Sequence, residues 1–102
     1  MRTRRTSLEI VADILEVIQG GTGSKSSIMR NANLSEALTE RYVKLLLSKN
    51  LIYYKDGAYK LTDKGVKILE NLRELRRLEL RLDELLNSTL SELSYSSYGT
   101  LT

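Results

Sequence analysis

Apolar residues recur every three or four positions in several segments of the chain, a spacing typical of amphipathic helices. In the first segment Ser7 is the expected N-cap, and the glycine-rich stretch from Gly20 to Ser24 is expected to end the helix. Its predicted apolar face consists of Leu8, Val11, Ile14, Leu15 and Ile18. A short second helix is predicted over residues 25–31, with Ile28 and Met29 facing inward.

A third helix is predicted from Asn33 to about Asn50, because Asn33 and Glu36 have the spacing of a capping box. Ser35 and Thr39 are then expected on its exposed face. Since roughly three residues separate it from the second helix, the two form a helix-turn-helix unit. Its predicted apolar face consists of Leu34, Ala37, Leu38, Tyr42, Leu45 and Leu46.

A β-hairpin is predicted over residues 51–61, because Asp56-Gly57 lies between two short runs of strand-forming residues. A two-residue turn places Tyr54 opposite Tyr59, and Ile52 opposite Leu61, on the face expected to pack against the helices. Tyr42 is also expected in the core. The other face of the hairpin is expected to be exposed and carries Tyr53, Lys55, Ala58 and Lys60.

A last helix is predicted from its cap at Thr62 to Leu93. About 30 residues of helix span ~45 Å, whereas a compact domain of ~100 residues has a radius of gyration near 13 Å. The helix is therefore expected to extend beyond the domain and to form a coiled-coil seam. A second copy of the chain is the simplest cover for the seam; folding back and binding another protein remain open. The predicted dimer interface is Ile68, Leu72, Leu75, Leu78, Leu82, Leu85 and Leu86.

This order of elements predicts a mainly α fold with a small β-hairpin: a winged helix-turn-helix followed by a long coiled-coil dimerisation helix. The predicted parts are a DNA-binding domain over residues 1–62, a dimerisation helix over 63–93 and a flexible tail over 94–102. In winged helices that bind DNA, the third helix enters the major groove and the hairpin reaches the backbone or minor groove.

The predicted third helix also carries a family resemblance. Ala32-Asn33-Leu34-Ser35, Ala37-Leu38-Thr39 and Arg41-Tyr42 look like the recognition-helix segment of the Sulfolobus ten-kilodalton "ten-a" family of archaeal winged-helix proteins. The run from Tyr59 to Gly65 is similar to the strand-to-helix junction there, and the resemblance covers roughly residues 7 to 86. It implies a homodimer joined by an antiparallel coiled coil, with an architectural role on DNA in an archaeon, its viruses or its plasmids.

Two carboxylates distinguish this chain from that family pattern. Glu40 stands where the family has a small residue, and Glu36 adds a second acid to the same helix. Carboxylates in the groove repel phosphates, although a carboxylate can accept a hydrogen bond from cytosine. The acids therefore favour a sequence-specific regulator, whereas the resemblance favours a general architectural protein.

The composition argues against catalysis. The chain has no His and no Cys. It therefore has no imidazole base, no thiolate, no Cys/His metal site and no disulfide. The loop from Gly20 to Ser26 lacks the Gly-Lys-Ser/Thr order of a phosphate-binding loop. We expect no enzyme activity, cofactor or metal, and no small-molecule ligand is inferred. No apolar run reaches the ~18 residues of a membrane span, so we expect a cytoplasmic, nucleoid-associated protein.

The net charge of +3 is concentrated in one part of the chain, because residues 1–62 hold ten of the 16 Lys and Arg but only six of the 13 acids. Arg2, Arg4 and Arg5 form either a DNA-contacting arm or a solvated terminus, and Arg41 and Lys44 either contact DNA or pair with nearby acids. The predicted DNA-binding residues are Arg2, Arg4, Arg5, Lys25, Ser26, Ser27, Arg30, Ser35, Thr39, Arg41, Lys44, Tyr53, Lys55 and Lys60. The leading hypothesis is a homodimeric protein on double-stranded DNA; the alternative is a protein-interaction module that does not use DNA.

Overall fold

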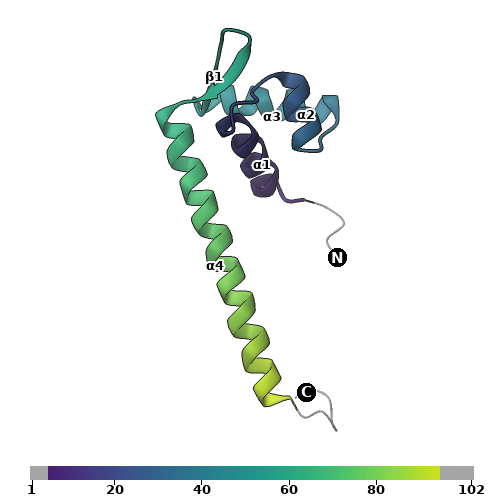
Figure 1. The fold of residues 1–102 in the computed structure, drawn as a ribbon, viewed down its shortest axis with the longest axis vertical. Helices are drawn as coiled ribbons and strands as arrows, with labels where there is room; N and C mark the ends of the chain where they lie inside the picture. Colours follow the sequence, from purple (N-terminus) through teal and green to yellow (C-terminus); the bar gives the residue numbers. More distant parts are fainter. Residues whose placement is uncertain (1–4, 95–102) are drawn as a thin grey trace. The chain divides into compact units, whose positions relative to one another are not determined.

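The computed structural model describes residues 5–94 and contains four helices and a two-stranded antiparallel sheet within that range (Figure 1). The elements are α1 (Ser7–Gln19), α2 (Lys25–Asn31), α3 (Glu36–Ser48), β1 (Ile52–Lys55), β2 (Ala58–Leu61) and α4 (Asp63–Leu93). The predicted fold class and the bounds of the second helix are confirmed. Arg2, Arg4 and nearly all of the predicted tail lie outside the described residues.

The chain divides into two units within α4. The first unit extends to Leu72 and the second starts at Arg73, so the first unit includes the initial turns of α4 that the sequence assigned to the dimerisation helix. Leu69 explains why, because this α4 side chain is only 1% exposed. Ile68 and Leu72 are partly buried against the same core.

The core of the first unit receives side chains from every helix and from the hairpin. α1 contacts α2 and β2, α2 contacts α3, and α3 contacts β1. Burying a Leu or Ile side chain is worth roughly 1.5–3 kcal/mol, so these contacts hold the unit together. The large apolar side chains with the least exposure are Ile14, Leu15, Ile28, Leu46, Ile52 and Leu69.

The start of α1 differs from the prediction by one residue. Thr6, not Ser7, is the N-cap: its hydroxyl accepts from the Glu9 amide at 3.1 Å, and the Glu9 carboxylate accepts from the Thr6 amide at 2.8 Å. This reciprocal pair is a capping box. The predicted apolar face was also partly wrong, because Leu8 is 61% exposed whereas Ile10 is 8% exposed.

The start of α3 also differs. Ser35, not Asn33, is the N-cap, since its hydroxyl accepts from the Leu38 amide at 3.1 Å. Asn33 has φ 56° and forms the turn between α2 and α3, and Asn50, with φ 60°, follows the end of α3. Asn tolerates this left-handed conformation better than most residues, which explains its presence at both turns.

The buried face of α3 is rotated by roughly a quarter turn from the predicted one, at about 100° per residue. Ala37 and Leu45, predicted to face inward, are exposed. Thr39 is completely buried. Its hydroxyl tolerates burial because it donates a hydrogen bond to the Ser35 carbonyl at 2.8 Å. The buried residues of the helix are Thr39, Tyr42, Val43 and Leu46.

The hairpin has the predicted register, with Ile52 opposite Leu61 and Tyr54 opposite Tyr59. Both turn residues, Asp56 and Gly57, have positive φ (52° and 80°), as a two-residue turn of the mirror-image type requires. The prediction of a buried Tyr54 was wrong. Its side chain contacts the ring of Tyr59, at a centroid distance of 4.9 Å, but is 60% exposed and does not pack against the core.

Two glycines allow close backbone contacts in the first unit. The Tyr59 amide donates to the Gly23 carbonyl at 2.8 Å, and a Cβ at Gly23 would lie 2.1 Å from the Tyr59 carbonyl oxygen. A Cβ at Gly65 would lie 2.0 Å from the Leu51 carbonyl oxygen. The predicted cap at Thr62 is confirmed, since its hydroxyl accepts from the Gly65 amide at 2.9 Å and donates to the Asn50 carbonyl at 2.8 Å.

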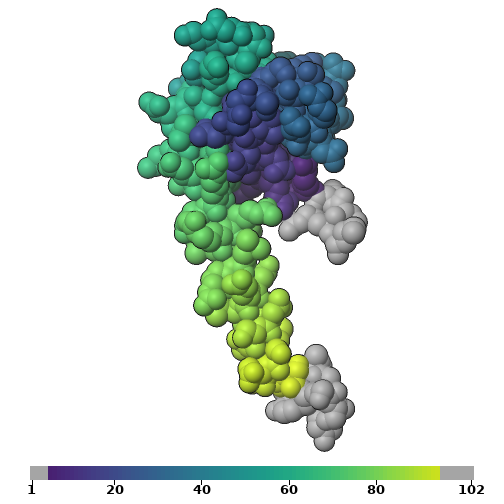
Figure 2. All heavy atoms as spheres, in the orientation of Figure 1, coloured from purple at the N-terminus to yellow at the C-terminus, as the bar shows by residue number. Residues whose placement is uncertain are grey.

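The second unit is the remaining part of α4, and its leucines are exposed. Figure 2 shows the side chains of this part along the helix, in green to yellow. None of the described helices has both the length and the apolar character needed to cross a membrane. The exposed leucines of the second unit are Leu75, Leu78, Leu80, Leu82, Leu85, Leu86, Leu90 and Leu93.

Candidate nucleic-acid interface

The outward face of α3 is cationic. At about 100° per residue, Ala37, Arg41, Lys44 and Ser48 lie opposite the buried face of the helix, and all four are exposed. The Arg41 guanidinium lies 5.9 Å from the centroid of the Tyr42 ring, within the range of a cation–π contact. A helix with this face presents two positive charges and two small side chains.

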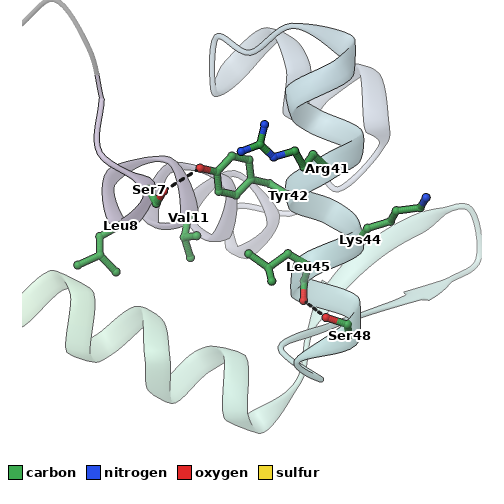
Figure 3. Close-up of a pocket in the computed structure, with 8 residues that line it drawn as sticks. All are labelled: Ser7, Leu8, Val11, Arg41, Tyr42, Lys44, Leu45 and Ser48. Atoms are coloured by element: carbon green, nitrogen blue, oxygen red, sulfur yellow. Dashed lines mark hydrogen bonds between the residues drawn. The ribbon is translucent and has the colours of Figure 1, made fainter.

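Beside this face, a groove of about 840 Å³ runs between α1 and α3 (Figure 3). Leu8 and Val11 line it from α1, and Leu45 lines it from α3. The Tyr42 hydroxyl donates to Ser7 Oγ at 3.0 Å and joins the two helices across it. Arg41, Lys44 and Ser48 complete the lining, so an apolar floor lies next to positive charge.

The two acids of α3 are paired with a lysine of α2. Lys25 Nζ lies 2.6 Å from Glu40 Oε1 and 3.3 Å from Glu36 Oε2. The hydrogen bond to Glu40 raises the pKa of Lys25, and the hydrogen bond from Lys25 lowers the pKa of Glu40. Arg41 and Lys44 were the partners that the sequence suggested for these acids, but the structure pairs both acids with Lys25. Lys25, Glu36 and Glu40 together carry one net negative charge.

Arg5 is used inside the first unit. Its guanidinium donates to Asp13 Oδ2 and to the Ala32 carbonyl, both at 2.7 Å, and to the Asn33 carbonyl at 3.2 Å. These contacts fix the start of α1 to the turn between α2 and α3. As placed, Arg5 has a structural role, and three of the five N–H donors of its guanidinium are used within the first unit.

The predicted base contact of Thr39 was wrong, because its side chain has no exposed surface. Ser35 is exposed, but its hydroxyl caps α3. On α2, Ser26 and Arg30 are exposed, whereas Ser27 is half-buried in the first turn, where its amide donates to Ser24 Oγ. Sequence reasoning missed Ala37 and Ser48, although Ser48 follows Arg41 by seven residues and Lys44 by four, which is helical spacing.

One face of the hairpin combines two lysines with a tyrosine. Tyr53 pairs with Lys60 and Lys55 pairs with Ala58, so these side chains lie on the same face of the two-stranded sheet. Tyr53 is 41% exposed, as predicted, and both lysines are exposed. This face can place positive charge beside a ring that packs against sugar or base.

Metal-ligand chemistry is not represented in residues 5–94, where no group of three or more His, Cys, Asp or Glu is placed to hold an ion. The surface that the described part of the chain offers consists of cations, hydroxyls, exposed tyrosines and an apolar groove.

The winged helix-turn-helix family matches residues 4–80, and the chain belongs to this family. An uncharacterized protein of Methanocaldococcus jannaschii, MJ0290, is 35% identical over 75 residues, which are 74% of this chain and 36% of the relative. The chain thus spans only about a third of that relative's length.

Two solved structures share the fold. Sso10a-2, a DNA-binding protein from Sulfolobus solfataricus, aligns with a TM-score of 0.76 and 17% identity over 90% of this chain and 100% of its own. The zinc-dependent MarR family transcriptional regulator AdcR aligns with a TM-score of 0.63 and 18% identity over 87% of this chain and 65% of its own. At these identities the likeness concerns the fold, including the long helix after the hairpin.

Proposed function

We propose that this chain is a homodimeric DNA-binding protein that acts as an architectural protein of the nucleoid or as a transcriptional regulator. In this proposal α3 enters the major groove, and the Tyr53 face of the hairpin lies on the backbone or in the minor groove. The observation that carries the proposal is the exposed face of α3, where Arg41 and Lys44 lie opposite the buried side of the helix. A winged helix uses this face of its third helix to read DNA.

Roles for the individual side chains follow from their surroundings. Arg41 and Lys44 bind phosphates or guanine edges, because both are exposed next to small residues that let the helix approach the bases. Arg30, Lys55 and Lys60 bind phosphates and set the orientation of the domain. Ser26 is exposed in the first turn of α2, so its hydroxyl can also donate a hydrogen bond to a phosphate.

Glu36 and Glu40 favour sequence preference over general affinity. Their tie to Lys25 reduces their repulsion of phosphates and holds Glu40 on the edge of the exposed face of α3. From there a carboxylate can accept from a cytosine amino group. Selection from random duplexes decides between the two roles: a recovered motif with a preference of ~10³-fold or more indicates a regulator, and its absence an architectural protein.

A second chain is the proposed cover for the leucines of the second unit. The exposed fractions of these leucines range from 46% to 64%, and contiguous apolar surface of this kind marks a protein–protein contact. Two linked DNA-binding units then contact spaced half-sites or two duplex segments. Dimerisation would also raise the affinity for DNA, because two linked weak contacts on one duplex bind more tightly than either contact alone.

The experiment is a salt titration of binding to a random duplex. We expect a complex at ~50 mM salt, with log K falling by about 0.9 per neutralised phosphate for each unit of log salt. If no complex forms at ~50 mM salt, the DNA-binding proposal is wrong. The apolar groove between α1 and α3 then favours the second candidate function, a protein-interaction module that uses this groove and the leucines of α4.

A further inference from the structure

The apolar floor of the groove between α1 and α3 is not explained by DNA binding. Leu8 and Val11 of α1 and Leu45 of α3 form this floor, and all three belong to the first unit. Figure 3 shows Leu45 extending from α3 toward Val11 of α1. A single exposed leucine is ordinary, but three apolar side chains lining one groove of about 840 Å³ form a contiguous patch. Phosphates gain nothing from such a patch, so it indicates a different ligand.

The charges of the groove restrict the chemistry of that ligand. Arg41 and Lys44 line it from α3, one helical turn apart, and no acidic side chain belongs to its lining. The acids of α3 are paired with Lys25 of α2, so both cations remain available to a ligand. A complementary ligand therefore carries apolar groups beside negative charge.

The length of the groove fits a helix. From Arg41 to Ser48 its lining follows α3 for seven residues, which is about 10 Å at 1.5 Å per residue. The apolar anchors of an amphipathic helix, at positions i, i+3, i+4 and i+7, span the same length. On the opposite wall, Leu8 and Val11 are three residues apart along α1 and so lie one turn apart. Two walls of this kind accept one face of a third helix.

A small molecule fits this groove less well than a helix. Sites for small molecules enclose most of the ligand surface, whereas Leu8 is largely exposed at the side of this groove. A helix covers an open groove with a continuous row of side chains, while its polar face stays in water. The groove therefore favours a segment of a protein over a free metabolite.

We propose that the groove between α1 and α3 binds an acidic amphipathic helix of another protein. Its apolar side chains pack on Leu8, Val11 and Leu45, and its carboxylates pair with Arg41 and Lys44. The same two cations belong to the proposed DNA-binding face, so the helix and the duplex exclude each other. The inference deepens the proposed function by naming a regulator of that face, and its effect on DNA rests on that function. The exclusion is reciprocal, because each ligand lowers the affinity for the other by the same factor.

A synthetic peptide tests the groove without DNA. The probe is a fluorescein-labelled, alanine-based peptide of ~18 residues, long enough to form a helix, with Leu at positions i, i+3, i+4 and i+7 and Glu beside them. Fluorescence anisotropy measures its binding to the intact chain. Replacing every Glu of the peptide by Gln is expected to weaken binding by ~10-fold, and replacing every Leu by Ser to weaken it by at least ~10-fold. Equal binding of the three peptides, or no binding of the first, overturns the proposal.

A variant of the groove separates docking from general attraction between opposite charges. Leu45→Lys removes an apolar contact and adds a cation, so docking is expected to weaken by ~10-fold, whereas a purely electrostatic association becomes stronger. Leu47→Lys is the matched control, because Leu47 is exposed on the same helix but lies outside the groove. It adds the same charge and is expected not to weaken binding. Leu8→Lys, on the other wall, repeats the test, and thermal unfolding shows that each variant is folded. Tighter binding by Leu45→Lys overturns the proposal.

Two further measurements identify what occupies the groove. The peptide is expected to displace a random duplex from the chain, and a complex that contains both ligands overturns the exclusion. A chain that binds the peptide but no duplex shows that the DNA-binding proposal is wrong, while docking in the groove is upheld. Leu8→Lys and Leu45→Lys are expected to sediment with the mass of the wild-type chain. A loss of mass in both variants shows that a second copy of this chain fills the groove, and it overturns the proposal.

Discussion

The two units of this chain use the same kind of residue in opposite ways. In the first unit, Leu46 and Leu69 are each 1% exposed, surrounded by other helices and by the hairpin. In the second unit, Leu82 is 64% exposed and Leu78 is 55% exposed, although their helical spacing is just as regular. Helical periodicity thus defines an apolar face, but burial depends on whether the rest of the chain supplies a partner for it.

The largest expected effect is on the first unit. Leu46→Ala removes a fully buried side chain and is expected to lower the free energy of unfolding by about 2–5 kcal/mol. The neighbouring Leu45→Ala is the matched control, because Leu45 is 42% exposed and its loss costs much less. Urea denaturation of both variants makes the comparison. Equal losses would show that the first unit lacks the tightly packed core described above.

The second prediction concerns the second unit. Leu78→Lys with Leu82→Lys places charges on the proposed interface, so we expect monomers that keep the unfolding behaviour of the first unit. Affinity for a duplex long enough to contact both chains of the dimer is expected to fall by ~10²-fold, because the monomer loses the DNA contacts of the partner chain. Sedimentation and duplex titration measure both effects. Arg77→Lys with Arg81→Lys, on the opposite side of α4, is the control. An unchanged mass refutes the dimer assignment.

The third prediction separates the DNA-binding surface from charge in general. Lys44→Ala is expected to lower duplex affinity by roughly tenfold and the salt slope by about 1, because one phosphate contact is lost. Lys67→Ala removes the same charge from an exposed position of α4 in the first unit and is expected to change neither value. Similar losses in the two variants would indicate that net charge, and not the outward face of α3, determines binding.

The last prediction concerns a small effect, that of Glu40→Gln, which removes the closer of the two Lys25 ion pairs. The pKa of Glu40 is lowered in the folded chain, so its contribution to stability is present at neutral pH. That contribution disappears as pH falls through the lowered pKa. The wild-type chain and Glu40→Gln are therefore expected to differ slightly at pH 7 and to converge at acidic pH, measured by thermal unfolding. Glu36→Gln, which breaks the longer 3.3 Å contact, has a smaller effect.

Local signals predicted much of the fold. The Asp56-Gly57 turn defined the hairpin register, because both residues adopt positive φ readily. Thr62 was recognisable as the cap of α4, and Leu93 as its end, because the apolar spacing continued to that point. These features depend on residues close together in the sequence.

Features that depend on tertiary contacts were not predictable in the same way. The buried face of α3 was predicted wrongly because a polar residue, Thr39, occupies a core position. Its buried hydroxyl is satisfied within its own helix. Tyr54 was assigned to the core because the register gave its face but not how far the helices extend beneath the hairpin. The pairing of Lys25 with Glu40 joins two helices, and no local spacing indicates it.

The most direct test is sedimentation equilibrium of the intact wild-type chain across micromolar concentrations. The account predicts a species of twice the 11.6 kDa chain mass, because the leucines of the second unit need a second copy to cover them. A single species of 11.6 kDa throughout that range would contradict it.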